Sequence, residues 1–403
     1  MYRMICRDFY IQKIRPFIDK DVVKVMSGIR RSGKSVMLEL IQRELLEQGR
    51  SEDSIIMLNF ESRLLPFAKN VQSAFDYLKP LLSEKKYLFF DEIQDLPGWE
   101  ELVNSLMIDF DVDIYITGSN AKLLSGELAT YLGGRYVEIK IYPFSFAEIL
   151  DIMRETQEEV NEAEAFLHYL SYGGMPFIYQ NKMEEQAALM YLEDLFDSII
   201  LKDVAQRNKI RDIGAFKNLL LYFIAEIGNT YSAASIKKYL KNENRSVSTE
   251  TLYNYIEYCK DACILQMVSR EDLIGKKILQ FQEKIYLTDH GLRQAVYGHN
   301  QRDINQILEN IVFMELLRRD YNVTIGKANT REVDFVAKKR EKRIYVQVAY
   351  MLADEKTVER EFGVLEEIPD NYPKFVITMD EIERSRNGIL HRNIREFLKG
   401  QEF

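Results

Sequence analysis

The clearest chemical signal in this sequence is a segment that fits the phosphate-loop pattern GxxxxGK[ST], namely Gly28-Ile29-Arg30-Arg31-Ser32-Gly33-Lys34-Ser35. Its glycines allow backbone N–H groups to approach phosphate oxygens, and a helix predicted to begin at Val36 adds the favourable end of its dipole. Lys34 is placed to reach the β- and γ-phosphates, and the Ser35 hydroxyl is placed to ligate Mg²⁺. The pattern therefore predicts a site for ATP and Mg²⁺. The expected nucleotide contacts are Gly28, Arg30, Arg31, Ser32, Gly33, Lys34, Ser35 and Val36.

Two adjacent carboxylates follow a second apolar run, Tyr87 to Phe90, and these are Asp91 and Glu92. Acidic turns are common, so this pair alone is a weak signal, but a phosphate loop upstream makes it informative. Side chains at the carboxyl end of a parallel strand point toward the ligand crevice of such a sheet. We expect Asp91 to hold Mg²⁺, directly or through water, and Glu92 to polarise the water that attacks the γ-phosphate.

The next apolar strand, Ile114 to Thr117, delivers further polar groups to the same edge. Ser119 and Asn120 are candidates to sense the γ-phosphate and orient the attacking water, although Gly-Ser-Asn is also an ordinary turn sequence. Arg135 precedes the fifth predicted strand. It acts either as an arginine finger, in its own subunit or a neighbour, or as a surface salt-bridge partner.

Arg30 and Arg31 are unusual residues for the interior of a phosphate loop. They contact the nucleotide or a lid, or they remain solvated.

The elements that must position these residues follow an alternating pattern over the first 150 residues, in which short apolar runs alternate with amphipathic stretches. This pattern is typical of a parallel α/β sheet. Four of the five predicted strands are almost continuously apolar, as expected where helices cover both faces, while the fifth alternates and is predicted to form an edge. The five are Val22 to Met26, Ser54 to Phe60, Tyr87 to Asp91, Asp113 to Thr117 and Tyr136 to Ile141.

Helical periodicity replaces this pattern after Pro143. Three helices and a hairpin are then predicted, in the order of a winged helix-turn-helix: Ala215 to Glu226, Ser232 to Leu240, Ser248 to Ala262, then strands Ile264 to Val268 and Lys284 to Leu287. Basic residues in this region, Lys237, Lys238, Lys241 and Arg245, suit a phosphate backbone. Winged helices also serve as lids and protein docks, so DNA binding stays one alternative.

A helix from Ile304 to Arg319 opens the last part of the chain, which continues into strands at Asn322 to Ile325, Glu332 to Ala337, Ile344 to Ala349 and Lys374 to Thr378. This part is predicted to be a separate small α/β domain. The predicted domains are residues 1–150, 151–294 and 295–403.

Composition sets outer limits on function. The 403 residues are 46% apolar, with a formal net charge of −9, so the surface as a whole does not attract nucleic acid, although a local basic face is compatible with that average. The three cysteines form no CxxC pair, which argues against a disulfide framework or a zinc site. No window approaches the roughly 20 apolar residues that cross a bilayer. We expect a cytoplasmic protein without a membrane partner.

Several segments together resemble the prokaryotic AAA-like (AAA_14 type) P-loop ATPases with a C-terminal DUF4143 domain. They are GIRRSGKS (28–35), LNFES (58–62), FFDEIQDLPGWE (89–100), ITGSNAKLL (116–124), LGGRYVEIKIYPFSFAEIL (132–150), YGGMP (172–176), KDVAQRNKI (202–210) and REVDFV (331–336). The resemblance implies a P-loop core of the additional-strand class with catalysis by the glutamate after the acidic strand. It also implies that the turn Gly174-Met175-Pro176 closes over the nucleotide.

The same resemblance implies that the C-terminal domain is similar to restriction-endonuclease-like nucleases. Their metal site uses a helix glutamate, a strand aspartate and a following ExK. Here the helix offers Glu309 or Glu315, the strand offers Glu332 and Asp334, and Gln347 and Ala349 replace the second carboxylate and the lysine. We therefore expect an inactive nuclease-like fold in which Asp334 is structural or helps to bind a partner.

These features predict a Mg²⁺-dependent ATPase that acts as a conformational switch or remodels a macromolecular partner, either another protein or further copies of itself. The alternative is a DNA-binding or DNA-processing protein in which ATP only sets the conformation.

Overall fold

The computed structural model describes residues 5–119, 132–155, 159–231, 233–242, 247–273, 277–298 and 303–400. They form two compact units, one of Met1–Pro143 with Asp261–Cys263 and the other of Phe144–Lys260 with Ile264–Phe403. The N-terminal unit therefore ends at Pro143, close to the predicted domain boundary at residue 150.

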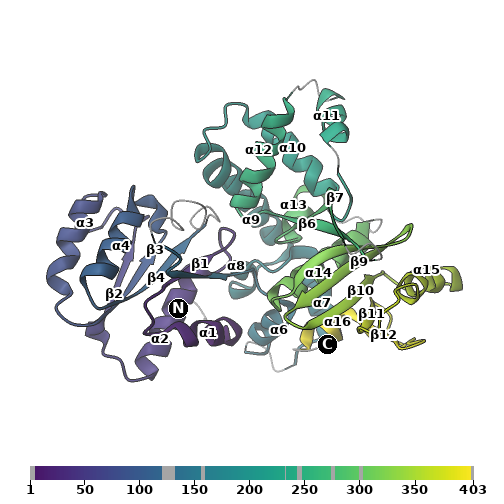
Figure 1. The fold of residues 1–403 in the computed structure, drawn as a ribbon, viewed down its shortest axis with the longest axis horizontal. Coiled ribbons are helices and arrows are strands. Elements are labelled where there is room, and N and C mark those ends of the chain that lie inside the picture. Colours follow the sequence, from purple (N-terminus) through teal and green to yellow (C-terminus); the bar gives the residue numbers. More distant parts are fainter. Residues whose placement is uncertain are drawn as a thin grey trace. The chain divides into compact units, whose positions relative to one another are not determined.

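The N-terminal unit is built on five parallel strands in the order β2-β3-β4-β1-β5 (Figure 1). The strands are β1 (Val23–Ser27), β2 (Ile55–Asn59), β3 (Lys86–Asp91), β4 (Val112–Gly118) and β5 (Tyr136–Lys140). All five predicted strands are confirmed to within one residue at each end, and β5 forms an edge as its alternating pattern predicted. Strand β4 separates β1 from β3, which is the arrangement of an additional-strand P-loop sheet.

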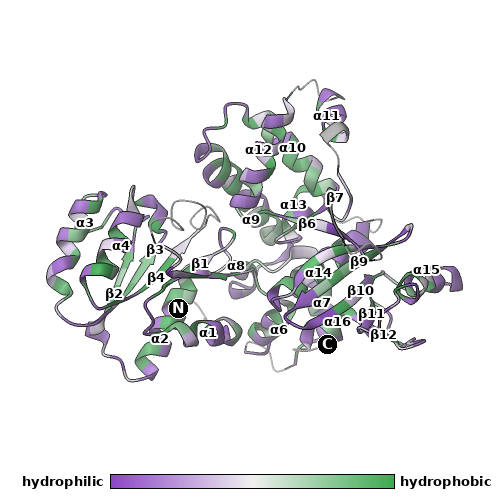
Figure 2. Ribbon diagram, viewed as in Figure 1, coloured by the Kyte–Doolittle hydropathy of each residue, from purple (hydrophilic) through white to green (hydrophobic). Residues whose placement is uncertain are grey.

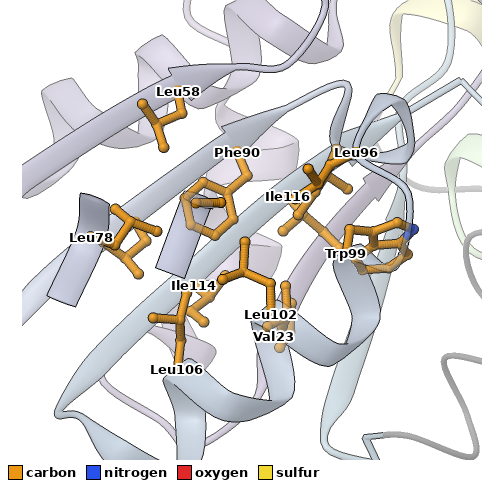
Figure 3. Close-up of a cluster of buried hydrophobic side chains, with 14 of the residues drawn as sticks. Val23, Leu58, Leu78, Phe90, Leu96, Trp99, Leu102, Leu106, Ile114 and Ile116 are labelled. Carbon is orange, nitrogen blue, oxygen red and sulfur yellow. The ribbon is translucent and has the colours of Figure 1, made fainter. Parts of the chain in front are cut away.

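Helices cover both faces of this sheet because successive side chains of a buried strand point to opposite sides. On one face, Leu88 and Phe90 of β3 pack in a cluster with α3 (Val71–Leu78) and α4 (Trp99–Asp109), which Figure 3 shows in part. On the other face, Tyr87 and Phe89 belong to a cluster with α1 (Asp8–Ile14) and α2 (Lys34–Glu47). In Figure 2 the strands are mostly hydrophobic, whereas the helices carry a hydrophilic side.

The C-terminal unit begins with helices. The first, α6 (Phe146–Arg154), starts at a capping box in which the Ser145 hydroxyl accepts the Glu148 N–H and the Glu148 carboxylate accepts the Ser145 N–H. The others are α7 (Glu162–Tyr172), α8 (Pro176–Gln180), α9 (Glu185–Ser198), a π-helical segment (Ile199–Gln206), α10 (Ile213–Ala225), α11 (Ala233–Asn242), α12 (Thr249–Asp261) and α13 (Gly291–Tyr297).

A seven-stranded sheet with the order β12-β11-β10-β9-β8-β6-β7 forms the rest of this unit (Figure 1). Its strands are β6 (Leu265–Asp272), β7 (Lys277–Leu287), β8 (Asn322–Ala328), β9 (Arg331–Lys339), β10 (Lys342–Val348), β11 (Lys374–Thr378) and β12 (Ile389–Asn393). Three helices accompany it: α14 (Ile304–Arg318), α15 (Glu355–Glu366) and α16 (Ile394–Lys399).

The hairpin that was predicted to be the wing of a separate module, β6 and β7, belongs to this sheet. Strand β6 pairs in parallel with β8, with Arg270 opposite Ile325. The predicted boundary after residue 294 therefore falls between strands of one sheet. The three helices α10, α11 and α12 and the hairpin follow the predicted order, while the winged-helix assignment itself stays a prediction.

Candidate nucleotide site

The phosphate loop joins β1 to α2 and requires both of its glycines. Gly28 has φ +151° and Gly33, the residue before α2, has φ +97°, a region that residues with a side chain rarely adopt. A Cβ atom on Gly28 would also lie only 2.2 Å from the carbonyl oxygen of Ile141. Glycine at both positions therefore allows the loop to adopt this backbone conformation.

Lys34 and Ser32 give the loop its polar interior. The Lys34 ammonium is buried and donates to the carbonyl oxygens of Gly28 and Ile29, at 3.1 Å each. The Ser32 hydroxyl is buried, and among the described residues it has no hydrogen-bond partner. A buried donor without a partner is costly unless something else satisfies it. Both groups therefore fit a loop that binds phosphate.

Asp91 lies at the centre of a group of hydrogen bonds beside the phosphate loop. Its carboxylate accepts hydrogen bonds from Ser35 Oγ at 3.0 Å, from Thr117 Oγ1 at 2.5 Å and from Asn59 Nδ2 at 3.0 Å. Burial raises the pKa of Asp91, and the hydrogen bonds from Thr117 and Ser35 act in the opposite direction. A hydroxyl and a carboxylate held together are the hard oxygen ligands that Mg²⁺ prefers beside phosphate oxygens.

Glu92 follows Asp91 at the carboxyl end of β3, with φ +50°. Its N–H donates to Thr117 Oγ1 at 3.0 Å, and its carboxylate accepts a hydrogen bond from Gln94. Thr117 of β4 therefore fixes both acidic residues. Ser119, one of the two candidates favoured from the sequence, is buried just beyond β4, and Asn120, the other, lies outside the described residues.

The structure does not bring Arg135 to the phosphate loop. Its guanidinium donates to Asn104 Oδ1 at 3.1 Å and lies 3.9 Å from a carboxylate oxygen of Asp21. Arg135 precedes β5, at the opposite end of the parallel strands from the loop after β1, about 15 Å away at roughly 3.3 Å per residue. A role as an arginine finger in its own subunit is therefore not supported, and a role in a neighbouring subunit stays a prediction.

Arg30 is partly buried, while Arg31 is exposed and has φ +66°. Contact of either residue with the nucleotide stays a prediction.

Two residues of the site were missed by sequence reasoning. Asn59, at the end of β2, supports Asp91, and a polar residue at the carboxyl end of a parallel strand was the available signal. Arg7 precedes α1 and donates to the carbonyl oxygen of Ser32 inside the phosphate loop. No local motif marks Arg7, because its partner lies 25 residues away.

In the C-terminal unit, the turn Gly174-Met175-Pro176 is anchored by Asp289. The two carboxylate oxygens accept the N–H groups of Gly174 and Gly291, at 2.8 and 2.9 Å. Burial raises the pKa of Asp289 to about 6, although these two hydrogen bonds lower it. A Cβ atom on Gly174 would lie 2.2 Å from the carbonyl oxygen of Phe144. Closure of this turn over a nucleotide stays a prediction.

The predicted nuclease-like residues line a cavity of about 1090 Å³ in the same unit, among them Glu309, Glu332, Asp334 and Gln347. Lys284 of β7 lies 2.5 Å from a Glu332 carboxylate oxygen and 3.6 Å from one of Glu309. Burial lowers the pKa of Lys284, but the charges of Glu309, Asp334 and Glu332 outweigh this and raise it. Burial and the charge of Glu309 raise the pKa of Asp334 well above its usual range.

A cation is nevertheless present in this cluster, although not at the position of the usual lysine. Ala349 takes the place of the usual lysine, but Lys284 supplies an ammonium group from a strand earlier in the chain. Glu315, the other glutamate considered on α14, is instead paired with Arg319 at 2.8 Å. Among the residues that the structure describes, no three His, Cys, Asp or Glu side chains are grouped to hold a metal ion.

The sheet order, the phosphate loop and the acidic strand end define an AAA-type P-loop ATPase domain. A family model described as an AAA domain matches residues 20–150. A second model, a domain of unknown function (DUF8612), matches residues 163–303. The DUF4143 assignment of the C-terminal domain stays a prediction.

Two curated relatives align with nearly the whole chain. An uncharacterized protein of Haemophilus influenzae is 39% identical over 378 residues, which cover 93% of this chain and 93% of that protein. The uncharacterized protein MJ1544 of Methanocaldococcus jannaschii is 33% identical over 379 residues, which cover 90% of this chain and 81% of that protein. The chain belongs to the family of these two proteins.

Among solved structures, the Walker-type ATPase PABY2304 of Pyrococcus abyssi is similar, with a TM-score of 0.52 at 16% identity over 73% of this chain and 96% of that chain. This likeness concerns the fold alone. Within the described residues, no helix has the length and apolar character to span a membrane.

Proposed function

We propose that the N-terminal unit hydrolyses ATP with Mg²⁺ and that the nucleotide state drives a conformational switch in the protein or remodels a macromolecular partner. The observation that carries this proposal is the contact between Ser35 and Asp91, 3.0 Å apart, directly beside the buried Lys34. The phosphate loop and the acidic end of β3, which come from distant parts of the sequence, are thus in contact, and this supports a shared site for Mg·ATP.

Each residue has a distinct role in this proposal. Lys34 exchanges its bonds to loop carbonyl oxygens for phosphate oxygens, and Ser32 supplies an additional hydroxyl donor. Ser35 and Asp91 would hold Mg²⁺, which neutralises charge on the phosphate oxygens when bound. Glu92 accepts a hydrogen bond from the attacking water and orients it. Thr117 keeps the two carboxylates in their relative positions.

Two substitutions separate binding from hydrolysis. Lys34→Ala is expected to lose ATP affinity, whereas Glu92→Gln is expected to bind ATP but not to hydrolyse it. Glu101→Gln, an exposed position on α4, serves as a matched control with wild-type behaviour. Equilibrium binding of a fluorescent ATP analogue and steady-state phosphate release measure the two properties. Turnover that is unchanged in Glu92→Gln contradicts the assignment of the base.

The partner of the switch can be identified by stimulation. ATP turnover of the full chain is measured with and without duplex DNA and over a range of protein concentrations. A specific activity that rises with protein concentration supports assembly of several copies, the setting in which Arg135 would act in a neighbouring subunit. A specific activity that is independent of concentration and of DNA argues for a switch that acts on another partner.

DNA binding is the second candidate function, and exposed residues on α11 and α12 favour it. Lys237, Lys238 and Lys241 are exposed on α11, and Tyr253 is half-exposed on α12. Cations with an aromatic side chain suit a phosphate backbone. Arg245, also predicted for this face, lies outside the described residues. DNA affinity that falls with salt and with neutralisation of Lys237 and Lys238 supports this function, and no binding at low salt removes it.

We also propose that the cavity around Asp334 does not cleave nucleic acid. Lys284 is engaged with Glu332 and Glu309, so its ammonium neutralises these partly buried carboxylates rather than remaining available to activate water. Incubation of the protein with plasmid DNA and Mg²⁺ or Mn²⁺ tests this. Metal-dependent cleavage that disappears in Asp334→Ala would show an active nuclease instead.

A further inference from the structure

Arg7 is a buried cation that joins two backbone segments of the N-terminal unit. Its side chain is only 3% exposed; Nη1 donates to the carbonyl oxygen of Ser32 at 3.1 Å and Nη2 donates to that of Tyr142 at 2.9 Å. The guanidinium also lies over the ring of Tyr10, 4.5 Å from its centroid. A planar guanidinium holds two acceptors in a fixed relation, which an ammonium group cannot do. Arg7 thus links the phosphate loop to the segment that leaves the unit.

The departing segment, Ile141 and Tyr142, is fixed against the phosphate loop by further contacts. The Ile141 N–H donates to the carbonyl oxygen of Ser27 at 2.7 Å, and the Ile141 carbonyl oxygen occupies the space where a Cβ atom of Gly28 would lie. The Tyr142 N–H donates to the Tyr10 hydroxyl at 3.2 Å. A change in the phosphate loop is therefore adjacent to the last residues of this unit.

Only Pro143 separates Tyr142 from Phe144, the first residue of the other unit. Within that unit, the Phe144 N–H donates to the Gly174 carbonyl oxygen at 2.7 Å, and Gly174 has no space for a side chain beside the Phe144 carbonyl oxygen. Proline restricts its own backbone and that of the preceding residue. The peptide that Arg7 holds and the peptide that Gly174 holds are thus joined through one proline along the chain.

We propose that Arg7 is a positioning residue that sets the geometry of the phosphate loop and transmits its occupancy to the Phe144–Gly174 contact. This inference rests on the proposed ATP site. Phosphate bound by the amides around Ser32 shifts or orders the peptide whose oxygen Arg7 holds. The same guanidinium then shifts or orders the Tyr142 peptide, and Pro143 passes the change to Phe144. Nucleotide binding thereby reaches the Gly174 turn through covalent bonds and hydrogen bonds.

Affinity measurements test the positioning role. Arg7→Met is expected to weaken Mg·ATP binding about tenfold, the effect of losing a charge-assisted hydrogen bond in the loop. Arg7→Lys is expected to be intermediate because it keeps the charge but not the fork. Arg15→Met is the matched control, because Arg15 is half-exposed and paired with Glu44 on the surface.

Chemical rescue distinguishes positioning from a general loss of stability. Guanidinium at about 10 mM is expected to restore ATP affinity to Arg7→Ala but not to Lys34→Ala, since only the former has a vacated guanidinium site. Wild-type affinity in Arg7→Met and Arg7→Lys would overturn the positioning role. If Arg7→Met does not fold, the positioning role is tested by the ATP affinity of Arg7→Lys and by the rescue of Arg7→Ala with guanidinium.

Amide hydrogen exchange tests the transmission. In the wild type, a slowly hydrolysed ATP analogue is expected to slow exchange both at the phosphate loop and at the Phe144 amide. In Arg7→Met saturated with the analogue, the loop is expected to be protected while Phe144 exchanges as in the nucleotide-free protein. Equal protection of Phe144 in both proteins overturns transmission through Arg7. A wild type that binds no ATP overturns the proposed function itself, which is a separate result.

Discussion

Replacement of Thr117 by valine tests the organisation of the acidic end of β3. The substitution keeps the shape of the side chain and removes a hydroxyl that does two things. It donates to Asp91 at 2.5 Å and accepts the Glu92 N–H at 3.0 Å. The expected effect follows from these two hydrogen bonds.

The magnitude follows from the two bonds. A hydrogen bond to a charged acceptor contributes about 1.5–3 kcal/mol, and a buried N–H left without an acceptor costs about 1–3 kcal/mol. Because Glu92 is partly exposed and water can reach its backbone in part, the lower ends apply. We expect Thr117→Val to lower the free energy of unfolding by about 2.5 kcal/mol. Thr117→Ser keeps the hydroxyl, loses one methyl group and is expected to cost about 1 kcal/mol.

The catalytic consequence is expected in turnover rather than in affinity. Lys34 and the loop amides are untouched, so the affinity for ATP should change by less than about twofold, whereas kcat should fall at least tenfold because Glu92 is no longer anchored. Denaturant unfolding without nucleotide and steady-state phosphate release measure the two quantities. If Thr117→Val unfolds and hydrolyses ATP like Thr117→Ser, the hydroxyl does not organise the site and the reasoning fails.

Three further predictions concern other parts of the fold. Gly28→Ala is expected to abolish nucleotide binding because its Cβ atom would lie 2.2 Å from a carbonyl oxygen, whereas Gly49→Ala, also at positive φ but with nothing within 4 Å, should cost only about 1 kcal/mol of stability and keep binding. Lys24→Met removes the cation that pairs with the buried carboxylate of Asp113 and should lower the free energy of unfolding by about 3–5 kcal/mol. Adding Asp113→Leu should recover part of this loss, as measured in denaturant titrations. The pKa of Asp289 is raised from 3.8 to about 6 in the folded protein, so the folded state binds the proton more tightly between these values and stability falls as pH rises through this window. The stability of the wild type relative to Asp289→Asn should thus fall by about 2 kcal/mol between pH 4 and 6, and a constant difference in denaturant titrations would contradict the assigned shift.

Local sequence patterns were sufficient to predict most helices and strands of the fold. Strands β1 to β5 are apolar runs bounded by polar or glycine residues, and each was located to within one residue because the signal lies in the strand itself. The alternating run of β5 correctly predicted an edge. Strand β12 and helices α15 and α16 were not predicted, because short amphipathic segments near the end of a chain give a weak periodic signal.

The sheet to which a strand belongs could be determined only from the tertiary structure. The hairpin β6–β7 has the local pattern of a wing, but its partner β8 lies about 50 residues further along the chain. No local property of Leu265–Asp272 specifies that partner. The same reason explains Lys284, whose role beside Glu309 and Asp334 exists only because β7 folds against the elements that carry them.

By itself, the sequence determined the phosphate loop, the acidic strand end and the strands that carry them. Those assignments depend on residue types at short spacing, where backbone conformation and side-chain chemistry are nearly local properties. Only the tertiary structure decided which side chains complete the site and which do not. It brought Asn59 and Thr117 to Asp91, placed Arg7 against the loop and kept Arg135 at the opposite end of the strands. The positions of these side chains depend on which strands pair and which charges are buried together. Both are determined by contacts between segments that are distant in the sequence.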